Sequence, residues 1–510
     1  MPGSAPDLQV DNEVEMSIYV NSKKRTTGAT LIIFGASGDL TSRKILPAVA
    51  SLLDQDQLPN EFSVIGVARS PLGNDGFRNL VRESATNIES IQTFIDNFHY
   101  IQGDYAAIST YQSLVALLDS IERTRETGKS RLFYLATVPD LFSTITSLLG
   151  QSGLSRNDTS SFTRIIIEKP FGADAASARS LNSEMHRSFS EEQIYRIDHY
   201  LGKETVQNLL ALRFSNAVFE PIWNRNYVNN VQITVAEHIG VGHRGGFYES
   251  AGALKDIVQN HMLQVLSLVL MEAPALMTAE SIQNEKVKLL SAVEIPPIPD
   301  IVNRAVRGQY VAGVISSEEV KSYRQERGVS PTSQTETFVA MRLGVDNWRW
   351  AGIPIFIRTG KRMAKRETQV VMEFNRAPHL PFTGGSARQL GPNRLILRIQ
   401  PEEEIKLIFG AKVPGQDYNI RSVAMDFSYA DTFREVSWDA YERLLLDALL
   451  GDRTLFLRSD EVIKAWEIVD PIQHAFADPN FPLHHYAAGT YGPKESSRLL
   501  GASGHYWNNI

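Results

Sequence analysis

The sequence contains no cysteine, no long apolar run and no excess of positive charge, and each absence excludes a class of protein. Without cysteine, the 510-residue chain forms no disulfide, no thiolate metal site and no cysteine nucleophile, which fits a reducing cytoplasm. No apolar run approaches the roughly 18 residues that a membrane span needs. The net charge of −7 gives no general cationic surface, so we expect no nucleic-acid partner, although it leaves room for a local basic pocket.

The first 27 residues combine Pro, Gly, Ser, Asn and charged residues with little periodicity. Acidic residues stand where a secretory signal would have basic ones, and no apolar core follows them. We therefore expect a flexible leader over residues 1–27 and a cytoplasmic protein. A hydrophobic fraction of 43% with 21% charged residues is ordinary for a globular chain, and 510 residues are enough for about two to four domains.

The segment TLIIFGASGDLTSRKILPAVASLL, residues 30–53, predicts a buried strand, a tight glycine turn and a helix. Gly35 and Gly38 would let backbone N–H groups approach a pyrophosphate at the N-terminus of that helix. Only two glycines of the usual three are present, so an ordinary strand, turn and helix is the competing interpretation. Pro47 lies inside the expected helix and should kink it or mark its true limit.

The next strand, FSVIGVAR, ends at Arg69. In dinucleotide-binding folds the end of this strand meets the adenosine ribose, where a carboxylate binds the 2′-hydroxyl and an arginine accommodates a 2′-phosphate. Arg69 has no carboxylate beside it, which predicts NADP over NAD; the alternative is a surface charge. The apolar segments RLFYLATVP and RIIIEKPFG predict further parallel strands, with helical stretches such as YQSLVALLDSIERT between strands.

The stretch RIDHYLGKE, residues 196–204, combines a carboxylate, an imidazole, a phenol and an ammonium group within nine residues. If it forms a helix, His199 and Lys203 share a face and make a fork for a phosphate, while Asp198 is free to hold another group. The competing interpretation is the solvated start of an amphipathic helix. Lys169, upstream, would emerge at the carboxyl end of its strand, where ligands bind in this architecture, unless it is merely solvated.

After about residue 209 the pattern changes to strand-length segments with turns between them: NVQITVAEHI, QTETFVAMRLGV, IPIFIRTGKR, TQVVMEFN and NRLILRIQP. Few long helices separate these segments, which predicts an antiparallel sheet. The chief exception is a helix expected from about residue 251 to 271, where His261 lies in phase with the apolar stripe and is as readily a core histidine as a functional one.

The chain as a whole therefore predicts an α/β part followed by an α+β part, without internal repeats. We expect a Rossmann-like NADP-binding domain over residues 28–208. A substrate and dimerisation domain with one large, mostly antiparallel sheet would follow over residues 209–510.

Four strings stand in the order that one known family has them: GASGDL at 35–40, EKPFG at 168–172, RIDHYLGKE, and DIVQNH at 256–261. On these motifs the chain resembles glucose-6-phosphate dehydrogenase over about residues 30–400, and FGAKVPG and YERLLLDALLGD extend the likeness. The resemblance implies oxidation of D-glucose 6-phosphate to 6-phospho-D-glucono-1,5-lactone with hydride transfer to NADP⁺, the first oxidative step of the pentose phosphate pathway. It also implies that no metal takes part and that the protein is a homodimer or homotetramer formed through the large sheet.

The resemblance assigns roles residue by residue. His261 would be the proton acceptor, and Asp198 would bind its other ring nitrogen and fix the tautomer. The phosphate would be gripped by His199, Tyr200 and Lys203. The other residues carried over are Glu237 and Asp256 for the sugar hydroxyls, Lys361 and Arg366 for substrate, Lys44 and Lys169 near both substrate and cofactor, and Gly35, Ala36, Ser37, Gly38, Asp39, Leu40 and Arg69 for the dinucleotide. The family motif also has a cis bond before the proline that corresponds to Pro170.

Two alternatives stay open at this point. One is a related enzyme that acts on another hexose phosphate or uses NAD freely, and Arg69 bears on the choice of cofactor. The other is a non-catalytic nucleotide-sensing or assembly protein that keeps the fold. A silent relative would be free to lose one of its site residues, so the joint presence of Asp198, His199, Lys203, Asp256 and His261 argues against it.

Overall fold

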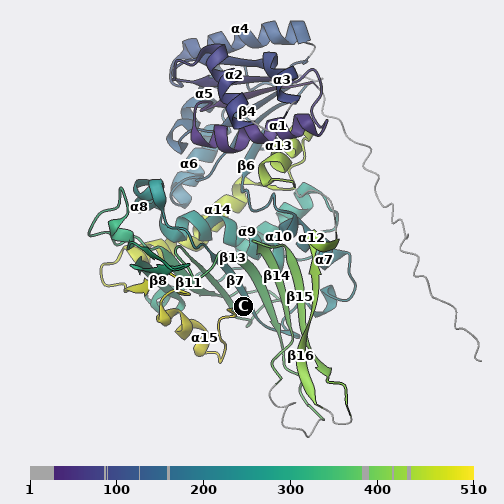
Figure 1. The fold of residues 1–510 in the computed structure, drawn as a ribbon, viewed down its shortest axis with the longest axis vertical. Helices are drawn as coiled ribbons and strands as arrows, with labels where there is room; N and C mark the ends of the chain where they lie inside the picture. Colours follow the sequence, from purple (N-terminus) through teal and green to yellow (C-terminus); the bar gives the residue numbers. More distant parts are fainter. Residues whose placement is uncertain are drawn as a thin grey trace, which may run out of the picture.

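The computed structural model describes residues 28–85, 88, 90–125, 127–157, 161–381, 390–415, 419–432 and 438–509. The leader expected over residues 1–27 lies outside these ranges. The described chain has an upper part built on one sheet and a larger lower part built on another (Figure 1).

The upper sheet has seven strands in the order β17-β6-β5-β4-β1-β2-β3. Every pairing in it is parallel except that of β17 with β6. Its strands are β1 (Thr30–Phe34), β2 (Ser63–Ala68), β3 (Phe98–Gln102), β4 (Arg131–Leu135), β5 (Thr163–Ile167), β6 (Ile194–Ile197) and β17 (Phe456–Leu457). All residues of β1 and β2 are buried, which explains their nearly continuous apolar sequences.

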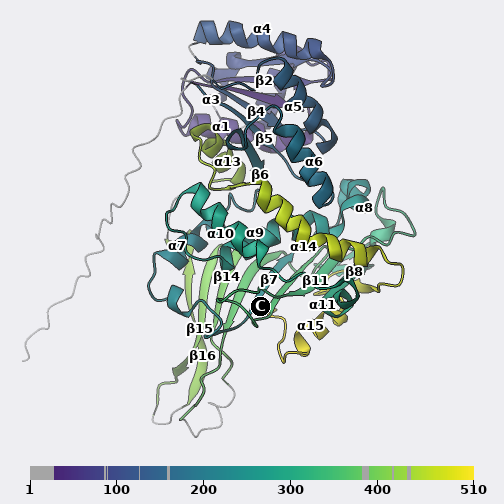
Figure 2. The same ribbon diagram turned by 180° about the vertical axis from the view of Figure 1, so that it is seen from behind.

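Helices lie on both faces of the upper sheet (Figures 1 and 2). They are α1 (Leu46–Asp54), α2 (Gly73–Ser84), α3 (Ser90–Phe94), α4 (Ile108–Arg125), α5 (Phe142–Gln151) and α6 (Ala175–Met185). Pro47 marks a limit, as one of its two expected effects required: a wide helical turn over Thr41–Ile45 precedes it, and Pro47 lies in the first turn of α1. A proline is tolerated there because the first turn of a helix needs no N–H from it.

The lower sheet has nine strands in the order β16-β15-β14-β13-β7-β12-β11-β8-β18. The predicted mostly antiparallel sheet is confirmed, although β7 pairs with β12, and β8 with β18, in parallel. Its strands are β7 (Val228–Ala236), β8 (Ala305–Val311), β11 (Phe338–Leu343), β12 (Ile355–Gly360), β13 (Glu367–Phe374), β14 (Arg394–Gln400), β15 (Glu404–Lys412), β16 (Ile420–Ser428) and β18 (Leu483–Ala487). A small separate hairpin joins β9 (Gly313–Ile315) to β10 (Glu318–Val320).

Helices α7, α9, α10 and α14 cover one face of the lower sheet (Figure 2). The helices that follow β6 along the chain are α7 (Glu204–Phe214), α8 (Gly245–Ala253), α9 (Leu263–Leu270), α10 (Ala279–Ser291), α11 (Ile301–Arg304), α12 (Tyr429–Thr432), α13 (Ala440–Leu450), α14 (Ser459–Ala477) and α15 (Arg498–Gly501). The longest of these helices, α14, has 19 residues, contains Pro471 and follows all of the strand segments named from the sequence.

The helix expected from about residue 251 to 271 is not one regular helix. Gly252 has φ 61° and ψ 178°, which breaks the chain direction. A wide π-type helix, η7 (Leu254–Met262), starts after the break and continues into α9. Functional side chains on η7 are therefore spaced by a π-type turn, and its start depends on one glycine.

The chain returns to the upper part near its C-terminal end. Helix α13 packs against α1, and Phe456 and Leu457 of β17 pair with Ile197 and Arg196 of β6. The upper sheet thus contains one strand, β17, from the part of the chain that follows the domain boundary expected at residue 208.

Candidate active site

Two strand ends of the upper sheet bring the first predicted site residues together. Strands β5 and β6 are parallel neighbours, with Ile167 opposite Arg196. Lys169 follows β5 by two residues and Asp198 follows β6 directly, so both emerge at the same edge of the sheet. The Lys169–Pro170 peptide bond is cis.

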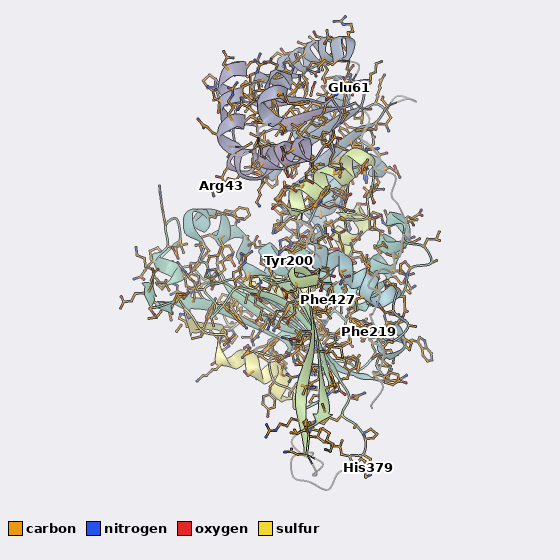
Figure 3. All side chains as sticks on the ribbon, turned by 45° about the vertical axis from the view of Figure 1, so that its right-hand side comes forward. Arg43, Glu61, Tyr200, Phe219, His379 and Phe427 are labelled. Atoms are coloured by element: carbon orange, nitrogen blue, oxygen red, sulfur yellow. The ribbon has the colours of Figure 1, made fainter. Side chains whose placement is uncertain are left out.

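Four strand ends of the lower sheet meet at one edge by the same logic. Strands β7 and β12 run parallel, so Glu237 and Lys361, which follow them, lie side by side with Lys361 Nζ 2.6 Å from Glu237 Oε2. Strand β13 starts at this edge and β14 ends there, which brings in Arg366 and Gln400. Tyr200 lies where the upper and lower parts meet (Figure 3).

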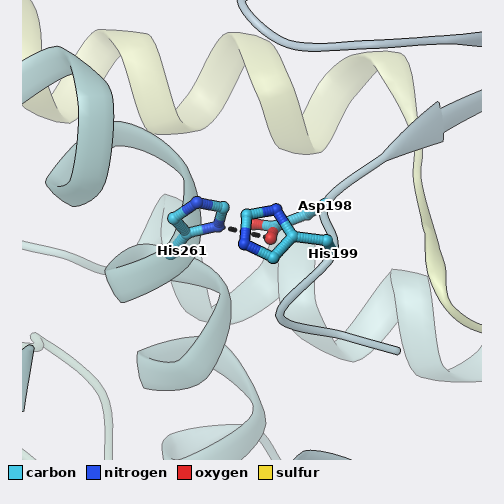
Figure 4. A group of neighbouring side chains, drawn as sticks. All are labelled: Asp198, His199 and His261. Carbon is cyan, nitrogen blue, oxygen red and sulfur yellow. Dashed lines mark hydrogen bonds and ion pairs between the residues drawn. The ribbon is translucent and has the colours of Figure 1, made fainter. Parts of the chain in front are cut away.

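His261, on η7, occupies the junction between the two parts. Its Nδ1 faces the Asp198 carboxylate (Figure 4). Its Nε2 lies 2.8 Å from Lys169 Nζ. Asp198 Oδ1 also accepts a hydrogen bond from the Tyr200 backbone N–H at 3.0 Å. His261 and Asp198 are each about 1% exposed, so the imidazole is both buried and held at each nitrogen.

The charges around His261 favour a neutral ring beside an ionised carboxylate. Burial opposes ionisation of Asp198, but the facing His261 ring, His199 and Lys169 hold the pKa of that carboxyl below its usual range. Burial lowers the pKa of His261, and Lys169 adds to that effect against the opposing charge of Asp198. With Nδ1–H donated to Asp198, the Nε2 lone pair is the basic atom of the ring.

The stretch RIDHYLGKE is not a helix, so the condition under which His199 and Lys203 would share a helix face is not met. Strand β6 ends at Ile197, turns follow, and α7 begins at Glu204 with Lys203 as its N-cap residue. The Asp198 side chain accepts a hydrogen bond from the Tyr200 N–H, which stabilises a turn here in preference to a helix. His199 and Lys203 consequently share no helix face.

The turn instead gathers its side chains around the His261 ring. The Tyr200 ring stacks on His261 at 4.2 Å between centroids, and His199 meets the same ring edge-on at 4.6 Å. Lys203 Nζ lies 4.3 Å from the centroid of the Tyr200 ring. The predicted phosphate-gripping residues are thus brought together by tertiary packing.

The basic side chains beside Tyr200 are placed where they can bind an anion. Burial and the neighbouring Arg366 lower the pKa of Lys203 to about 8. Burial, followed by the proximity of His261, holds the pKa of His199 well below its usual value. A phosphate would stabilise the charged forms of these groups, because an opposite charge reverses such shifts.

Gln400 belongs to this phosphate side and was missed from the sequence. Its amide nitrogen donates to the Tyr200 hydroxyl at 3.0 Å, and its Oε1 accepts from Arg366 at 2.9 Å. Gln400 therefore joins the phenol to the exposed cation. A single glutamine at a strand end gives no sequence signal of this kind; only the pairing of β13 with β14 places it here.

Carboxylates and lysines alternate on the other side of His261. Lys169 Nζ donates to the Asp256 backbone oxygen at 2.9 Å and lies 3.4 Å from its Oδ1. Burial opposes ionisation of Asp256, but Lys169, Lys361 and Arg244 lower its pKa to about 2. Asp256 and Glu237 are thus anionic acceptors suited to hydroxyl groups.

The predicted dinucleotide residues cluster after β1 and β2. Gly35 has φ 92°, and a Cβ there would lie 2.3 Å from the Ala136 carbonyl oxygen, so only glycine fits. The turn continues through Ala36, Ser37 and Gly38, and the helical segment begins at Asp39 and Leu40. Such a side-chain-free turn before a helix fits the pyrophosphate of a nicotinamide dinucleotide.

Arg69 directly follows β2, as expected from the sequence, and its exposed side chain places the guanidinium 5.9 Å from the centroid of the Tyr105 ring. Ser70, which the sequence reasoning missed, places its hydroxyl 3.0 Å from that of Ser37. Lys44 is half-exposed and pairs with Asp439 at 3.1 Å, which ties the first helix to the N-terminus of α13. These groups line the same edge as the glycine turn.

Two more residues near the junction were missed. Glu168 accepts from the Tyr134 hydroxyl at 2.6 Å, and burial raises the pKa of its carboxyl. The Tyr441 ring of α13 lies parallel to His199 at 6.4 Å. Tyr441 follows His199 by more than two hundred residues, so no local pattern could have placed it there.

Asp198, His199 and His261 also form a group close enough to share a metal ion (Figure 4). Both nitrogens of His261 already face charged partners, Asp198 and Lys169. The Lys169 ammonium would repel a cation bound at Nε2. The arrangement therefore suits proton transfer better than metal binding.

Within the described ranges, no helix has the length and apolar character that crossing a membrane requires.

Comparison with known proteins gives consistent matches over nearly the whole chain. The family model described as glucose-6-phosphate dehydrogenase, NAD binding domain, matches residues 32–208, and the C-terminal domain model of the same family matches residues 210–508. The glucose-6-phosphate 1-dehydrogenase of Aggregatibacter actinomycetemcomitans is 46% identical over 482 residues, 94% of this chain and 96% of that protein. The Bacillus subtilis protein of the same name is 42% identical over 484 residues, covering 94% and 98%.

Solved structures agree with these sequence matches. A glucose-6-phosphate dehydrogenase in complex with its substrate glucose 6-phosphate superposes with a TM-score of 0.87 at 33% identity, covering 95% of this chain and 99% of that one. Glucose-6-phosphate 1-dehydrogenase from Mycobacterium avium gives a TM-score of 0.80 at 33% identity, covering 94% and 99%.

Proposed function

This chain belongs to the glucose-6-phosphate dehydrogenase family and oxidises D-glucose 6-phosphate to 6-phospho-D-glucono-1,5-lactone, and we propose that His261 is its general base and NADP⁺ its cofactor. This reaction is the first oxidative step of the pentose phosphate pathway. The observation that carries the base assignment is the buried His261 ring, fixed by Asp198 at Nδ1 and presenting Nε2 at the junction of the two parts.

Oxidation of the C1 hydroxyl requires removal of its proton as the hydride leaves. His261 Nε2 takes this proton, and Asp198 stabilises the imidazolium that results. The substrate hydroxyl replaces Lys169 at Nε2, while the Asp256 backbone oxygen, 2.9 Å from Nζ, keeps the ammonium beside the reacting carbon. When bound, the nicotinamide ring of NADP⁺ supplies the hydride acceptor.

The substrate is held at both ends in this proposal. His199, Tyr200, Lys203 and Arg366 bind the phosphate, with Gln400 orienting the phenol and Arg366. Glu237, Asp256 and Lys361 bind the sugar hydroxyls. Unphosphorylated glucose would leave the cationic donors without a partner, so the phosphate provides strong discrimination and helps to fix C1.

The cofactor would lie over the turn Gly35–Leu40 with Lys44 and Lys169 close to its reactive end. The preference for NADP over NAD rests on Arg69, supported by the hydroxyl groups of Ser37 and Ser70 nearby. A 2′-phosphate bound there would face one arginine and two hydroxyl donors.

Several properties of the whole molecule belong to the same proposal. We propose a leader over residues 1–27, a cofactor domain over residues 28–208 and a substrate and dimerisation domain over residues 209–510. A homodimer or homotetramer would form through the large sheet, whose edge strand β16 exposes Val423 and Met425. The cysteine-free composition supports a cytoplasmic location.

The test follows the absorbance of reduced nicotinamide when purified protein meets glucose 6-phosphate with NADP⁺ or NAD⁺, with glucose as the control. Rapid reduction of NADP⁺ that requires the phosphate is the expected outcome. Faster reduction of NAD⁺ would refute the Arg69 assignment, and equal rates with glucose would refute the phosphate grip.

A further inference from the structure

Glu336 contacts the start of the helix that carries His261 and Asp256. Its Oε1 accepts a hydrogen bond from the Leu254 N–H at 3.1 Å, and its backbone oxygen accepts from the Ala253 N–H at 3.0 Å. These N–H groups stand at the first turn of η7, where a helix has no internal partner for them. A carboxylate at this end also complements the helix dipole. Glu336 therefore caps η7 from a different element of the chain.

Gly252 shows how closely Glu336 packs against the start of η7. Gly252 has φ 61°, and a Cβ built on it would lie 2.2 Å from Glu336 Oε1. The carboxylate thus fills the space of a side chain at residue 252, and the chain breaks direction there before η7 begins. The helix start and the Glu336 carboxylate are therefore packed directly against each other.

The segment that carries Glu336 also holds a second part of the site. The backbone oxygen of Thr337 accepts from the Lys361 N–H at 2.9 Å. The Tyr486 hydroxyl lies 3.1 Å from that of Thr337 and donates to the Lys361 backbone oxygen at 2.7 Å. Residues 336 and 337 therefore connect η7, which carries His261, to Lys361, whose ammonium group faces the carboxylates of Glu237 and Asp256.

We propose that Glu336 is a positioning residue for the reaction: its side chain fixes the start of η7, and so sets His261 and Asp256 relative to Lys361. This inference rests on the proposed function of His261. Glu336 is about 9% exposed and lines a cavity of 610 Å³ together with Lys255 and Arg307, away from the groups that face His261. It acts through the helix, by the hydrogen bond that its side chain accepts from the Leu254 N–H. Burial raises the pKa of its carboxyl.

The experiment separates reach from charge with two variants. Glu336→Gln keeps an oxygen acceptor at the same distance from the Leu254 N–H and removes the charge. Glu336→Asp keeps the charge and shortens the side chain by one methylene group. If position decides, kcat/KM for glucose 6-phosphate should stay within about 3-fold of the unmodified enzyme in Glu336→Gln and fall on the order of 10- to 100-fold in Glu336→Asp, mostly through kcat.

The pH profile of kcat/KM distinguishes positioning from general stability. When η7 shifts, His261 loses part of its burial and its contact with Lys169, so the acid limb of Glu336→Asp should move to higher pH, and that of Glu336→Gln should not. Glu249→Gln is the matched control, because Glu249 lines the same cavity but binds Tyr323 and Ser333 instead of η7. It should keep the acid limb unchanged whatever its melting temperature.

The proposal is overturned if Glu336→Asp, folded by circular dichroism, keeps the kcat/KM and acid limb of the unmodified enzyme, or if Glu336→Gln is as impaired as Glu336→Asp. Failure of the His261 assignment is a separate outcome. It would appear as near-normal turnover in the single variant His261→Ala, which keeps Glu336. The two failures are therefore distinguishable.

Discussion

At the scale of single residues, the pairing of Asp198 with His261 should set the acid limb of the pH profile of kcat/KM. Asp198→Asn should lower kcat by roughly 10²- to 10⁴-fold with a small effect on KM. The reason is that His261 loses the carboxylate that fixes its tautomer and stabilises the imidazolium. The Asp198 charge also raises the pKa of His261 against burial and Lys169. Removing it lowers that pKa further, so the acid limb of kcat/KM should move to lower pH.

Steady-state kinetics from acid to neutral pH check this prediction. The exposed acid Asp426, on β16, provides a control in Asp426→Asn, for which we expect an unchanged profile. An acid limb in Asp198→Asn that moved to higher pH would contradict the described charge balance.

Lys203 should set the alkaline limb of the pH profile of kcat/KM, because its charge contributes to substrate binding. Its pKa of about 8 means that the free enzyme carries the ammonium below that pH and loses it above. We therefore expect kcat/KM for glucose 6-phosphate to fall as the pH rises through about 8, because the phosphate loses one cation. Lys203→Arg should move this fall to higher pH, since arginine stays protonated. Lys203→Ala should raise KM by roughly 10- to 100-fold. An alkaline limb that is identical in Lys203→Arg would refute the assignment.

At the scale of elements, the glycine turn after β1 allows no side chain. Gly35→Ala should weaken NADP⁺ binding and destabilise the fold by about 1–3 kcal/mol, because it adds a positive-φ alanine and a clash with the Ala136 oxygen. Calorimetric titration and thermal unfolding measure the two effects. Gly153→Ala is the control, since Gly153 has φ 73° with no atom within 4 Å of an added Cβ. It should lose some stability and keep cofactor affinity; equal losses of affinity in both variants would contradict the prediction.

Elements also show where local patterns mislead. The stretch RIDHYLGKE has helical spacing between His199 and Lys203, but a short carboxylate that binds the backbone two residues ahead favours a turn. The helix from residue 251 was predicted from its apolar period, which is unaffected by the break at Gly252. A period reports which face is buried, and it does not report whether each turn has α or π geometry.

At the scale of the whole molecule, β16 is the outermost strand of the large sheet among the described residues. It leaves Met425 62% exposed, and an edge strand of this kind is a template for pairing or packing against a second copy. Met425→Lys should shift the protein toward monomer in light scattering after size-exclusion chromatography. Val314→Lys replaces a residue of similar exposure, 57%, on the β9–β10 hairpin and should leave the mass unchanged. A mass unaffected by Met425→Lys would place the interface elsewhere.

The sequence by itself determined strands β1, β2, β4, β5, β7 and β11 to β14, the glycine turn and a list of candidate site residues, because burial imposes periods of apolar residues and chemistry restricts residue types. The tertiary structure alone decided how they meet. Parallel pairing aligns the ends of β5 with β6 and of β7 with β12, and so joins Lys169 to Asp198 and Glu237 to Lys361. Gln400, Tyr441 and Glu336 acquire a role only through such contacts, since their partners are distant in sequence and a side chain carries no local sign of what it will face.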